Sequence, residues 1–494
     1  MFMKKFGKII ALLLCVMASL SVIACGGGNG GSVGDSVKDD VGKIGKRGEK
    51  GTLSLNVYAA GYGTDWITSA VSLFLQDNAG VKYYLEASPL ALSAVKTQLE
   101  NGNCKDDVIL VSAADYESYV AKGYIEDLTD VYQSVIPDSG KKVEEVIDAN
   151  VMADKVINGK KFGIPWQDNP PSGLIYNKKM FERYGWTIPE TMDEFWTLCD
   201  KIAEDTEGSV APLTFGGADG NGYLYTNFPQ WLSECYGADG MKEFFRLGSP
   251  EVYSVQQEGR AKVYSTLARL TKGKTSKGTD ITLDGSVGAT AITAQSNFIN
   301  GRAAMIVGGT YFPTEMVDYI KIKNFDAGYM PMPHINADKK SIDGSKDTSN
   351  VLFSADNGVF AIPASAANKD LAKQFLIHML TEKSYSSFVK ATHGLLRPLK
   401  GVKVNTDGFD AFTLAAFNGF YHDDKAERVY AVTSNKVLEK DILAVFFAYE
   451  GGFFNRIAGA ESYEAAKSIA EGCTANEISC VLKKWDANKN EWKI

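Results

Sequence analysis

Apolar and polar positions first show a regular period in residues 53–58, where every second side chain is apolar. This period of two predicts a β-strand. A glycine-rich turn at 61–63 and an amphipathic stretch with helical spacing follow it. The order then repeats, with a strand over 81–86, a helix over 90–99 and a continuous apolar run over 107–111 that suits a buried parallel strand. The βαβαβ order predicts a doubly wound α/β lobe.

The same alternation of strands and helices continues beyond this first lobe. Thr191 and Glu194 have the spacing of a capping box, which predicts the start of a helix, and apolar residues over 371–380 predict another. Apolar strands are expected at 303–307 and 358–362. At 494 residues the chain is about three times the usual domain length, so we expect two α/β lobes rather than one domain or a β-sandwich.

The amino-terminal residues predict export. Residues 1–24 carry three lysines and no acidic residue, and an apolar run over 9–24 follows the lysines. This arrangement is typical of a signal peptide. The run has 16 residues, short of the ~20 that a membrane-spanning helix needs, and no later apolar stretch comes closer, so no integral membrane architecture is expected.

The signal ends in Val22-Ile23-Ala24-Cys25, which looks like a bacterial lipobox. We expect cleavage before Cys25 and lipidation of its thiol, and the alternative is an ordinary signal peptide that happens to contain a cysteine. Residues 25–50 are rich in glycine and charge and poor in apolar side chains. Such a composition is expected to form a flexible tether.

Charge and cysteine usage exclude several classes of function. Lys and Arg number 52 against 60 Asp and Glu, and loss of the three signal lysines takes the net charge from -8 to -11, so no basic field exists for nucleic acid. No CxxC motif or Cys/His cluster is present, and we expect neither a metal nor a cofactor. Cys104, Cys199 and Cys235 are interpreted as small buried residues, whereas Cys473 and Cys480 either close a disulfide loop or stay reduced.

Motifs for catalysis are also missing from the sequence. There is no HExxH motif, and the four histidines are scattered. Asp423 and Asp424 are adjacent and would point apart on a strand, which does not suit the acid–base pair of a glycoside hydrolase. We therefore do not expect an enzyme.

Five segments of the chain together resemble one protein family. They are GYGTDWI at 61–67, DVILVSAADYESYVAKGYIEDLTD at 107–130, NGKKFGIPWQDNPPSGLIYNKKMFERYGWTIPETMDEFWTLCDKI at 158–202, NGRAAMIVGGTYF at 300–312 and GVFAIPASAANKDLAKQFL at 358–376. In this order they resemble the carbohydrate-associated extracellular solute-binding proteins of ABC importers, the family that includes maltose-binding protein. The resemblance covers roughly 53–399. It departs from the family in GGTYF, where many relatives carry a Trp, and in an insertion-like run over 246–290.

The resemblance implies a type II periplasmic-binding-protein-like fold, in which two doubly wound lobes are joined by crossover strands with a ligand cleft between them. The first lobe would comprise 51–163 plus 327–381, and the second 164–326 plus 382–494. It also implies a monomer that captures a carbohydrate, expected to be an oligosaccharide, by lobe closure and delivers it to an ABC permease. With Cys25 lipidated, the protein would be held on the outer face of the cell membrane, at the cell surface or in the periplasm.

Binding a neutral sugar requires flat apolar faces and convergent hydrogen-bonding groups, so aromatic and polar residues in loops are the natural candidates. Asp65 and Trp66 stand between the first strand and the first helix, where open α/β sheets place ligands. The alternative is that Asp65 caps the helix and Trp66 packs beneath it. Asp115 and Tyr116 follow the strand that ends at Val111, and the alternative for Asp115 is again a helix N-cap.

A second candidate group lies at the predicted first crossover. Trp166 offers an aromatic face, and Gln167, Asp168 and Asn169 offer groups that bind hydroxyls. The alternative is that Trp166 packs inside the crossover.

The third group is spread over two later loops. Asp219 and Tyr223 belong to a glycine-rich polar loop that Trp231 follows, and a structural turn is the alternative for this loop. Tyr311 follows the strand that ends at Val307, where the resemblance places an aromatic residue against the sugar. Arg397 completes the candidate set.

Two kinds of function stay open at this point. The first is a lipid-anchored binding protein, whose ligand is a carbohydrate or, as an alternative within the same fold, a polyamine or another cation. The second is a surface lipoprotein that degrades glycans with unrecognised carboxylates. His393 in the same THGLLRP segment as Arg397 is interpreted as an ordinary surface or core histidine.

Overall fold

The computed structural model describes residues 43–153, 155–219, 222–246, 257–355, 358–420, 426–430 and 453–471. The chain divides into two compact units. Unit 1 takes its residues from 1–169, 310–315 and 355–424, and unit 2 takes its residues from 170–309, 316–354 and 425–494. Cys25, Asp423, Asp424, Cys473 and Cys480 lie outside the described residues, so the expectations about them stay predictions.

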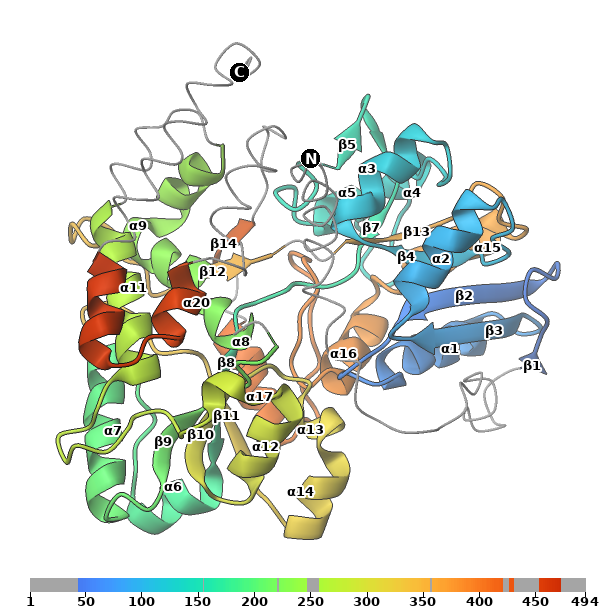
Figure 1. Cartoon of the computed structure of the whole chain (residues 1–494). Helices are drawn as coiled ribbons and strands as arrows, with labels where there is room; N and C mark the ends of the chain where they lie inside the picture. The colour runs from blue at the N-terminus through green and yellow to red at the C-terminus, as the bar shows by residue number, and fades with distance from the viewer. Residues whose placement is uncertain are drawn as a thin grey trace, which may run out of the picture. The chain divides into compact units, whose positions relative to one another are not determined.

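Unit 1 is built on a six-stranded sheet with the order β1-β3-β2-β4-β13-β7 (Figure 1). The strands are β1 (Lys43–Ile44), β2 (Thr52–Tyr58), β3 (Lys82–Ser88), β4 (Val108–Val111), β7 (Ile164–Pro165) and β13 (Val359–Ala361). The first four strands in this order are parallel, and β13 is antiparallel to both β4 and β7. Four of these strands, β2, β3, β4 and β13, confirm the strands predicted from apolar periodicity.

The helices of unit 1 bury amphipathic faces against this sheet and one another. They are α1 (Asp65–Asp77), α2 (Ala91–Glu100), α3 (Ala113–Ala121), α4 (Thr129–Gln133), α5 (Val143–Val146), α13 (Phe312–Glu315), α15 (Lys369–His378), α16 (Glu382–Ala391) and α17 (Ala411–Phe420), with a short hairpin of β5 (Val156–Ile157) and β6 (Lys160–Lys161). Helix α1 packs on α16, so a helix late in the chain covers an early one.

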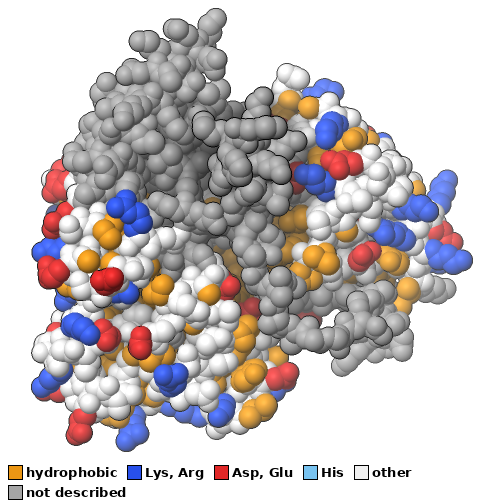
Figure 2. All heavy atoms as spheres, in the orientation of Figure 1, with side chains coloured by type: hydrophobic (Ala, Val, Ile, Leu, Met, Phe, Trp, Pro, Cys, Tyr) orange, Lys and Arg blue, Asp and Glu red, His pale blue; other side chains and the backbone are white. Residues whose placement is uncertain are grey.

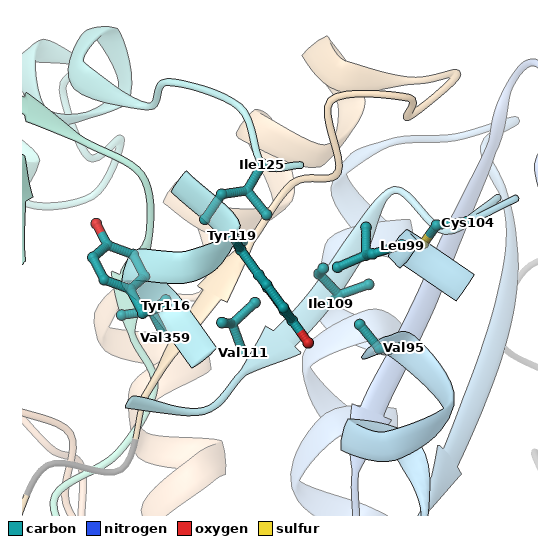
Figure 3. Packing of buried hydrophobic residues seen from close by; sticks show 10 residues of the cluster. Val95, Leu99, Cys104, Ile109, Val111, Tyr116, Tyr119, Ile125 and Val359 are labelled. Atoms are coloured by element: carbon teal, nitrogen blue, oxygen red, sulfur yellow. The ribbon is translucent and has the colours of Figure 1, made fainter. Parts of the chain in front are cut away.

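One apolar cluster shows how α2 and α3 share a face of the sheet (Figure 3). Val95 from α2, Ile109 and Val111 from β4, and Tyr116 and Tyr119 from α3 belong to it, and all are at most 3% exposed. This packing holds α2 and α3 against β4.

The amino-terminal boundary of unit 1 differs from the expectation that residues 25–50 are a flexible tether. Strand β1 pairs in parallel with β3, with Lys43 opposite Lys82. Arg47 then donates from Nε to Oδ1 of buried Asp106 at 2.7 Å and from Nη2 to Gln98 at 2.7 Å. Nη2 of Arg47 also donates to Oδ2 of Asp106, which makes the pair bidentate. Because a bidentate guanidinium–carboxylate pair has a fixed geometry, residues 43–50 belong to the fold rather than to a tether.

Unit 2 contains a four-stranded sheet with the order β11-β8-β10-β9. The strands are β8 (Gly173–Asn177), β9 (Ala211–Thr214), β10 (Ala303–Gly308) and β11 (Ala327–Met330). Strand β8 is antiparallel to both neighbours, and β9 is parallel to β10. A separate parallel pair joins β12 (Val351–Ser354) to β14 (Glu427–Tyr430). The strand predicted at 303–307 is confirmed as β10.

The helices of unit 2 include one whose start was predicted from its cap. They are α6 (Lys178–Tyr184), α7 (Met192–Asp205), α8 (Gly222–Tyr225), α9 (Asn227–Arg246), α11 (Gln257–Lys272), α12 (Ala291–Ile299), α14 (Val317–Lys323) and α20 (Phe453–Ala458), with a 3-10 turn at Ser286–Gly288. Thr191 and Glu194 form the expected capping box of α7. In unit 1, helix α15 confirms the helix predicted around 371–380.

The limits of the two units differ from the expected lobe boundaries at 163, 327 and 381. Residues 327–354 lie in unit 2 because β11 completes its sheet by pairing with β8. Residues 382–420 lie in unit 1 because α16 packs on α1. Long-range pairing of this kind decides the boundaries, and periodicity along the chain does not report it.

Three further findings concern the surface and the cysteines. Within the part of the chain that the structure describes, no helix is both long and apolar enough to cross a membrane. On the face in Figure 2, Lys and Arg side chains are interspersed with Asp and Glu over the described surface. Cys104, Cys199 and Cys235 are buried free thiols, as expected.

Candidate functional site

The carboxyl edge of the unit 1 sheet gathers several of the candidate loops. Strands β2, β4 and β7 run in one direction, so they end at the same edge, which is also where β13 begins. Residues 59–64, 112–116 and 166–169 follow these strand ends. Ligands of open α/β sheets bind outside the carboxyl ends of the strands. This edge is therefore the candidate site of unit 1.

A pair of tyrosines lies at this edge. The rings of Tyr62 and Tyr311 are 5.7 Å apart and nearly perpendicular, and both side chains are half-buried. The hydroxyl of Tyr62 lies 3.2 Å from Oγ1 of Thr310, and either oxygen can donate. A Cβ at Gly61 would stand 3.2 Å from Cβ and Cγ of Tyr311, so the absence of a side chain at Gly61 lets the two loops approach. The pair combines aromatic surface with hydroxyl groups.

Residues 310–315 reach this edge although both neighbours, Gly309 and Met316, belong to unit 2. The segment turns into α13, where the backbone N–H groups of Thr314 and Glu315 donate to the carbonyl of Tyr311. Burial raises the pKa of the Tyr58 phenol at the end of β2, and the carboxylate of Glu315 adds to this shift. The segment thus brings an aromatic ring, hydroxyls and a carboxylate to the end of β2.

Trp66 and Trp166 meet in the core beneath this edge. They are 2% and 6% exposed, and their ring centroids are 5.5 Å apart. Phe360 lies 6.3 Å from each of them and Phe388 lies 6.2 Å from Trp66. In this structure both indoles are core side chains, which is the packing alternative for each.

The three residues after Trp166 have different environments. Asp168 is buried and donates its backbone N–H to the carbonyl of Leu396 at 2.9 Å. Asn169 is exposed, and its carbonyl accepts from the N–H of Ala355 at 3.0 Å. Gln167 is only 9% exposed, and among the described residues its buried Oε1 has no hydrogen-bond donor. Buried carbonyl oxygens are normally satisfied, so water or a ligand hydroxyl is the expected partner of Gln167.

The two acidic candidates near helix starts are not N-caps. Thr64 occupies the N-cap of α1, and Asp65 is the exposed first residue of that helix. Ser112 caps α3, and Asp115 accepts from Ser112 Oγ at 2.8 Å and from Lys96 Nζ at 3.0 Å. Asp65 therefore stays available at the edge, whereas the carboxylate of Asp115 is already paired.

Tyr116 and Arg397 are placed inside unit 1. The Tyr116 ring belongs to the cluster in Figure 3, and its hydroxyl donates to the carbonyl of Lys155 at 2.8 Å. Arg397 is 1% exposed, stacks 4.3 Å over the ring of Phe388 and donates to the carbonyl of Met379. Burial lowers the pKa of Arg397 to about 10. In this structure both side chains pack in the core of unit 1, and their role as ligand contacts stays a prediction.

The candidates in unit 2 lie after β9, at a second carboxyl edge. Asp219 accepts from the backbone N–H of Ala291 at 2.6 Å, at the first residue of α12. A Cβ at Gly217 would stand 2.4 Å from the carbonyl oxygen of Val287, so this loop packs against backbone. Tyr223 is half-buried on α8, and its carbonyl accepts from Thr226 Oγ1 at 2.8 Å. The loop has the structural role that was its alternative.

Trp231 is a core residue of unit 2. It is 0% exposed, and its indole N–H donates to the carbonyl of Pro333 at 3.0 Å. In this structure Trp231 is a packing residue, and its role as a sugar-stacking residue stays a prediction. Within the described residues no group of three or more His, Cys, Asp or Glu could hold a metal ion.

The structure therefore brings Tyr311, Gln167 and Asp65 to one sheet edge, where Asn169 is also exposed. It shows packing or pairing for the side chains of Trp66, Asp115, Tyr116, Trp166, Asp219, Trp231 and Arg397. Tyr62 and Thr310 were not among the candidates. The signal for Tyr62 was its place between Gly61 and Gly63 directly after a strand, where a core aromatic is not expected. The signal for Thr310 was its position next to Tyr311.

Comparisons with known proteins agree on one family. The family model for bacterial extracellular solute-binding proteins matches residues 60–385. The diacetylchitobiose-binding protein DasA of Streptomyces coelicolor is 24% identical over 413 residues, which cover 83% of this chain and 86% of DasA. The apo form of RafE from Streptococcus pneumoniae has a TM-score of 0.60 at 18% identity, covering 86% of this chain and 98% of RafE. RafE in complex with raffinose has a TM-score of 0.57 at 18% identity, with 86% and 99% covered.

Proposed function

Because the chain belongs to the family of bacterial extracellular solute-binding proteins, we propose that it captures a carbohydrate and hands it to an ABC import permease. The single observation that carries the choice of ligand is the half-buried Tyr62–Tyr311 pair at the carboxyl edge of the unit 1 sheet. Relatives named as binding proteins for diacetylchitobiose and for melibiose, raffinose and stachyose support an oligosaccharide.

The proposed contacts follow the chemistry of a neutral sugar. The C–H face of a pyranose ring packs on aromatic surface, which Tyr62 and Tyr311 supply. Sugar hydroxyls donate to carbonyl and carboxylate oxygens, and Oε1 of Gln167 and the exposed carboxylate of Asp65 supply these. We place the ligand against this edge.

The protein acts by binding rather than by catalysis in this proposal. A glycoside hydrolase needs two carboxyl groups about 5–9.5 Å apart across the sugar. Of the acidic candidates, Asp115 is paired with Lys96, Asp219 accepts from the first N–H of α12 and Asp168 is buried, so Asp65 is the exposed carboxylate among them. Incubation with oligosaccharides should therefore release no new reducing ends, and their appearance would support the glycan-degrading alternative.

A thermal-shift panel tests the proposal most directly. Melibiose, raffinose, stachyose and diacetylchitobiose are each added to the purified protein, with spermidine as the probe for the cationic alternative. A ligand that binds only the folded state at about 100 times its Kd stabilises it by ~2.7 kcal/mol. We expect at least one sugar to raise the melting temperature. A shift with spermidine alone would favour the cationic ligand, which the exposed Asp65 makes a reasonable competitor.

Closure of the lobes on the ligand is part of the same proposal. A ligand that binds the closed state better than the open one shifts the population toward closure. Small-angle scattering should show a smaller radius of gyration with the sugar that gives the largest thermal shift. Identical profiles at saturation would contradict closure without contradicting binding.

Lipid anchoring at Cys25 completes the proposed function. The lipobox-like Val22-Ile23-Ala24-Cys25 supports a mature protein held on the outer face of the membrane. Cys25→Ala should move the protein from the membrane fraction to the medium or the soluble extract while its sugar affinity stays unchanged. An unaltered membrane fraction would contradict the anchor.

A further inference from the structure

The loop at 61–63 and the segment 310–315 are joined at three points within unit 1. Tyr62 lies against Thr310 and Tyr311, as described above. A Cβ at Gly63 would stand 3.2 Å from the side-chain methyl Cγ2 of Thr314, so the Thr314 side chain also lies close to the Gly63 backbone. The position of the tyrosine pair therefore depends on what holds Thr314.

His393 contacts Thr314 from the opposite side. Its Nε2 lies 3.1 Å from Thr314 Oγ1, and its Nδ1 lies 3.2 Å from Oγ1 of Thr413 on α17. The ring is also edge-on to Phe412 with 6.3 Å between centroids. The imidazole thus bridges the start of α17 and α13.

The backbone conformation of His393 and Gly394 directs the imidazole ring toward Thr314 and Thr413. His393 has a φ of 54°, which few residues other than glycine adopt, and it follows the end of α16 at Ala391. Gly394 has a φ of 103°, and a Cβ there would stand 2.8 Å from Cβ of Ala416. Left-handed residues persist where the surrounding structure determines them, and they cluster at functional sites.

We propose that His393 is the positioning residue that holds Thr314, and through it the Tyr62–Tyr311 pair, in the geometry that binds the sugar. The inference rests on the proposed function for its ligand but not for its effect on the segment 310–315. A neutral imidazole has one donor and one acceptor, and a threonine hydroxyl can serve as either, so one ring satisfies both partners. His393 is therefore not an ordinary surface histidine.

The electrostatics favour the neutral ring. Burial lowers the pKa of His393, while the carboxylates of Asp410 and Asp65 oppose this shift. Glu315, next to Thr314, is a further carboxylate on α13, and Lys390 is a cation on α16. Because the pKa is lowered, the neutral bridge is complete near pH 7. Protonation as the pH falls below the ordinary value near 6.5 would place a charge in the bridge and weaken it.

The test uses three full-chain variants and two readouts. His393→Ala removes the bridge, and His393→Gln keeps a donor and an acceptor in a side chain that does not titrate. His378→Gln is the matched control, because His378 is also half-buried with a pKa lowered by burial but packs on Phe74 instead. The first readout is amide hydrogen exchange of 310–315 without ligand, and the second is the Kd for the sugar that gives the largest thermal shift, between pH 5 and pH 7.5.

We expect His393→Ala to speed exchange in 310–315 about tenfold and to weaken sugar binding about tenfold. His393→Gln should restore both values near pH 7 and lose the wild-type weakening toward pH 5, and His378→Gln should match the wild type. Wild-type exchange in His393→Ala, or the same pH profile in His393→Gln and wild type, overturns the proposal. If no sugar binds the wild type, the proposed function fails, and the exchange measurement still decides the role of His393.

Discussion

The carboxyl edges of the two sheets carry the same kinds of residue, aromatic and polar, but these residues differ in burial and in hydrogen bonding. At the unit 1 edge, Tyr62 and Tyr311 are half-buried, and Gln167 has an oxygen with no protein donor among the described residues. At the unit 2 edge, Trp231 is fully buried and Asp219 is bound to the start of α12. An aromatic or acidic residue after a strand is thus not by itself a ligand contact.

The glycines of the two edges show how this difference arises. Gly61 faces the Tyr311 side chain, so a ring rather than backbone lies beside it. Gly216 and Gly217 instead face the backbones of Ala291 and Val287, with ideal Cβ positions as near as 2.7 and 2.4 Å. A glycine-rich loop that packs against backbone leaves no room for a ligand at the sheet edge. A glycine-rich loop that packs against a side chain places that side chain at the edge, where a ligand can contact it. Four substitutions test this contrast.

The largest effect is expected for Trp231→Ala. Truncation of a fully buried Trp leaves a cavity and typically costs ~3–5 kcal/mol of stability. Its indole hydrogen bond to Pro333 would also be lost. Urea unfolding without ligand should show the loss, with sugar affinity retained in the fraction that folds. Wild-type stability together with weakened sugar binding would instead show that Trp231 contacts the ligand.

Tyr311→Ala should show the reverse pattern. The ring is half-buried, so its removal should leave the unliganded melting temperature near that of the wild type. Truncation of an aromatic contact at the centre of an interface typically costs ~2–4 kcal/mol, which corresponds to roughly 30- to 1,000-fold in Kd. We expect at least a tenfold loss by titration calorimetry. Wild-type affinity would mean that the sugar binds elsewhere.

Asp219→Ala tests the structural role of the unit 2 loop. The carboxylate accepts from the first N–H of α12 and lies at the positive end of that helix. Loss of such a group typically costs about 0.5–2 kcal/mol of stability. We expect a loss of about 1 kcal/mol in urea unfolding with an unchanged Kd. Unchanged stability with a tenfold weaker Kd would contradict the contrast between the two edges.

Sequence patterns predicted the strands better than the site. Strands β2, β4 and β10 were predictable because each buries consecutive side chains and packs against a helix that is near it in sequence. The Trp66–Trp166 contact joins residues 100 positions apart, and no periodicity reports such a pairing. For the same reason Tyr62 was missed, since its importance depends on a segment from beyond residue 309. Side-chain burial, which only the fold decides, separated Tyr311 from Trp231.

Gln167→Leu gives the smallest and most selective test. Leucine is branched like glutamine but one bond shorter and apolar, and among the described residues no donor loses a partner with Gln167 Oε1. Stability should therefore stay near that of the wild type or rise slightly, because replacing an unsatisfied buried polar group is neutral to favourable. A sugar hydroxyl that donates to this oxygen would lose one hydrogen bond, worth ~1 kcal/mol or roughly fivefold in Kd. Calorimetry on sugars that lack single hydroxyls would then identify the partner, because the analogue without that hydroxyl should bind the variant and the wild type equally. If Gln167→Leu binds every sugar as the wild type does but unfolds more easily, the oxygen binds a structural water instead. Gln167 would then stabilise the unit 1 edge rather than contact the ligand.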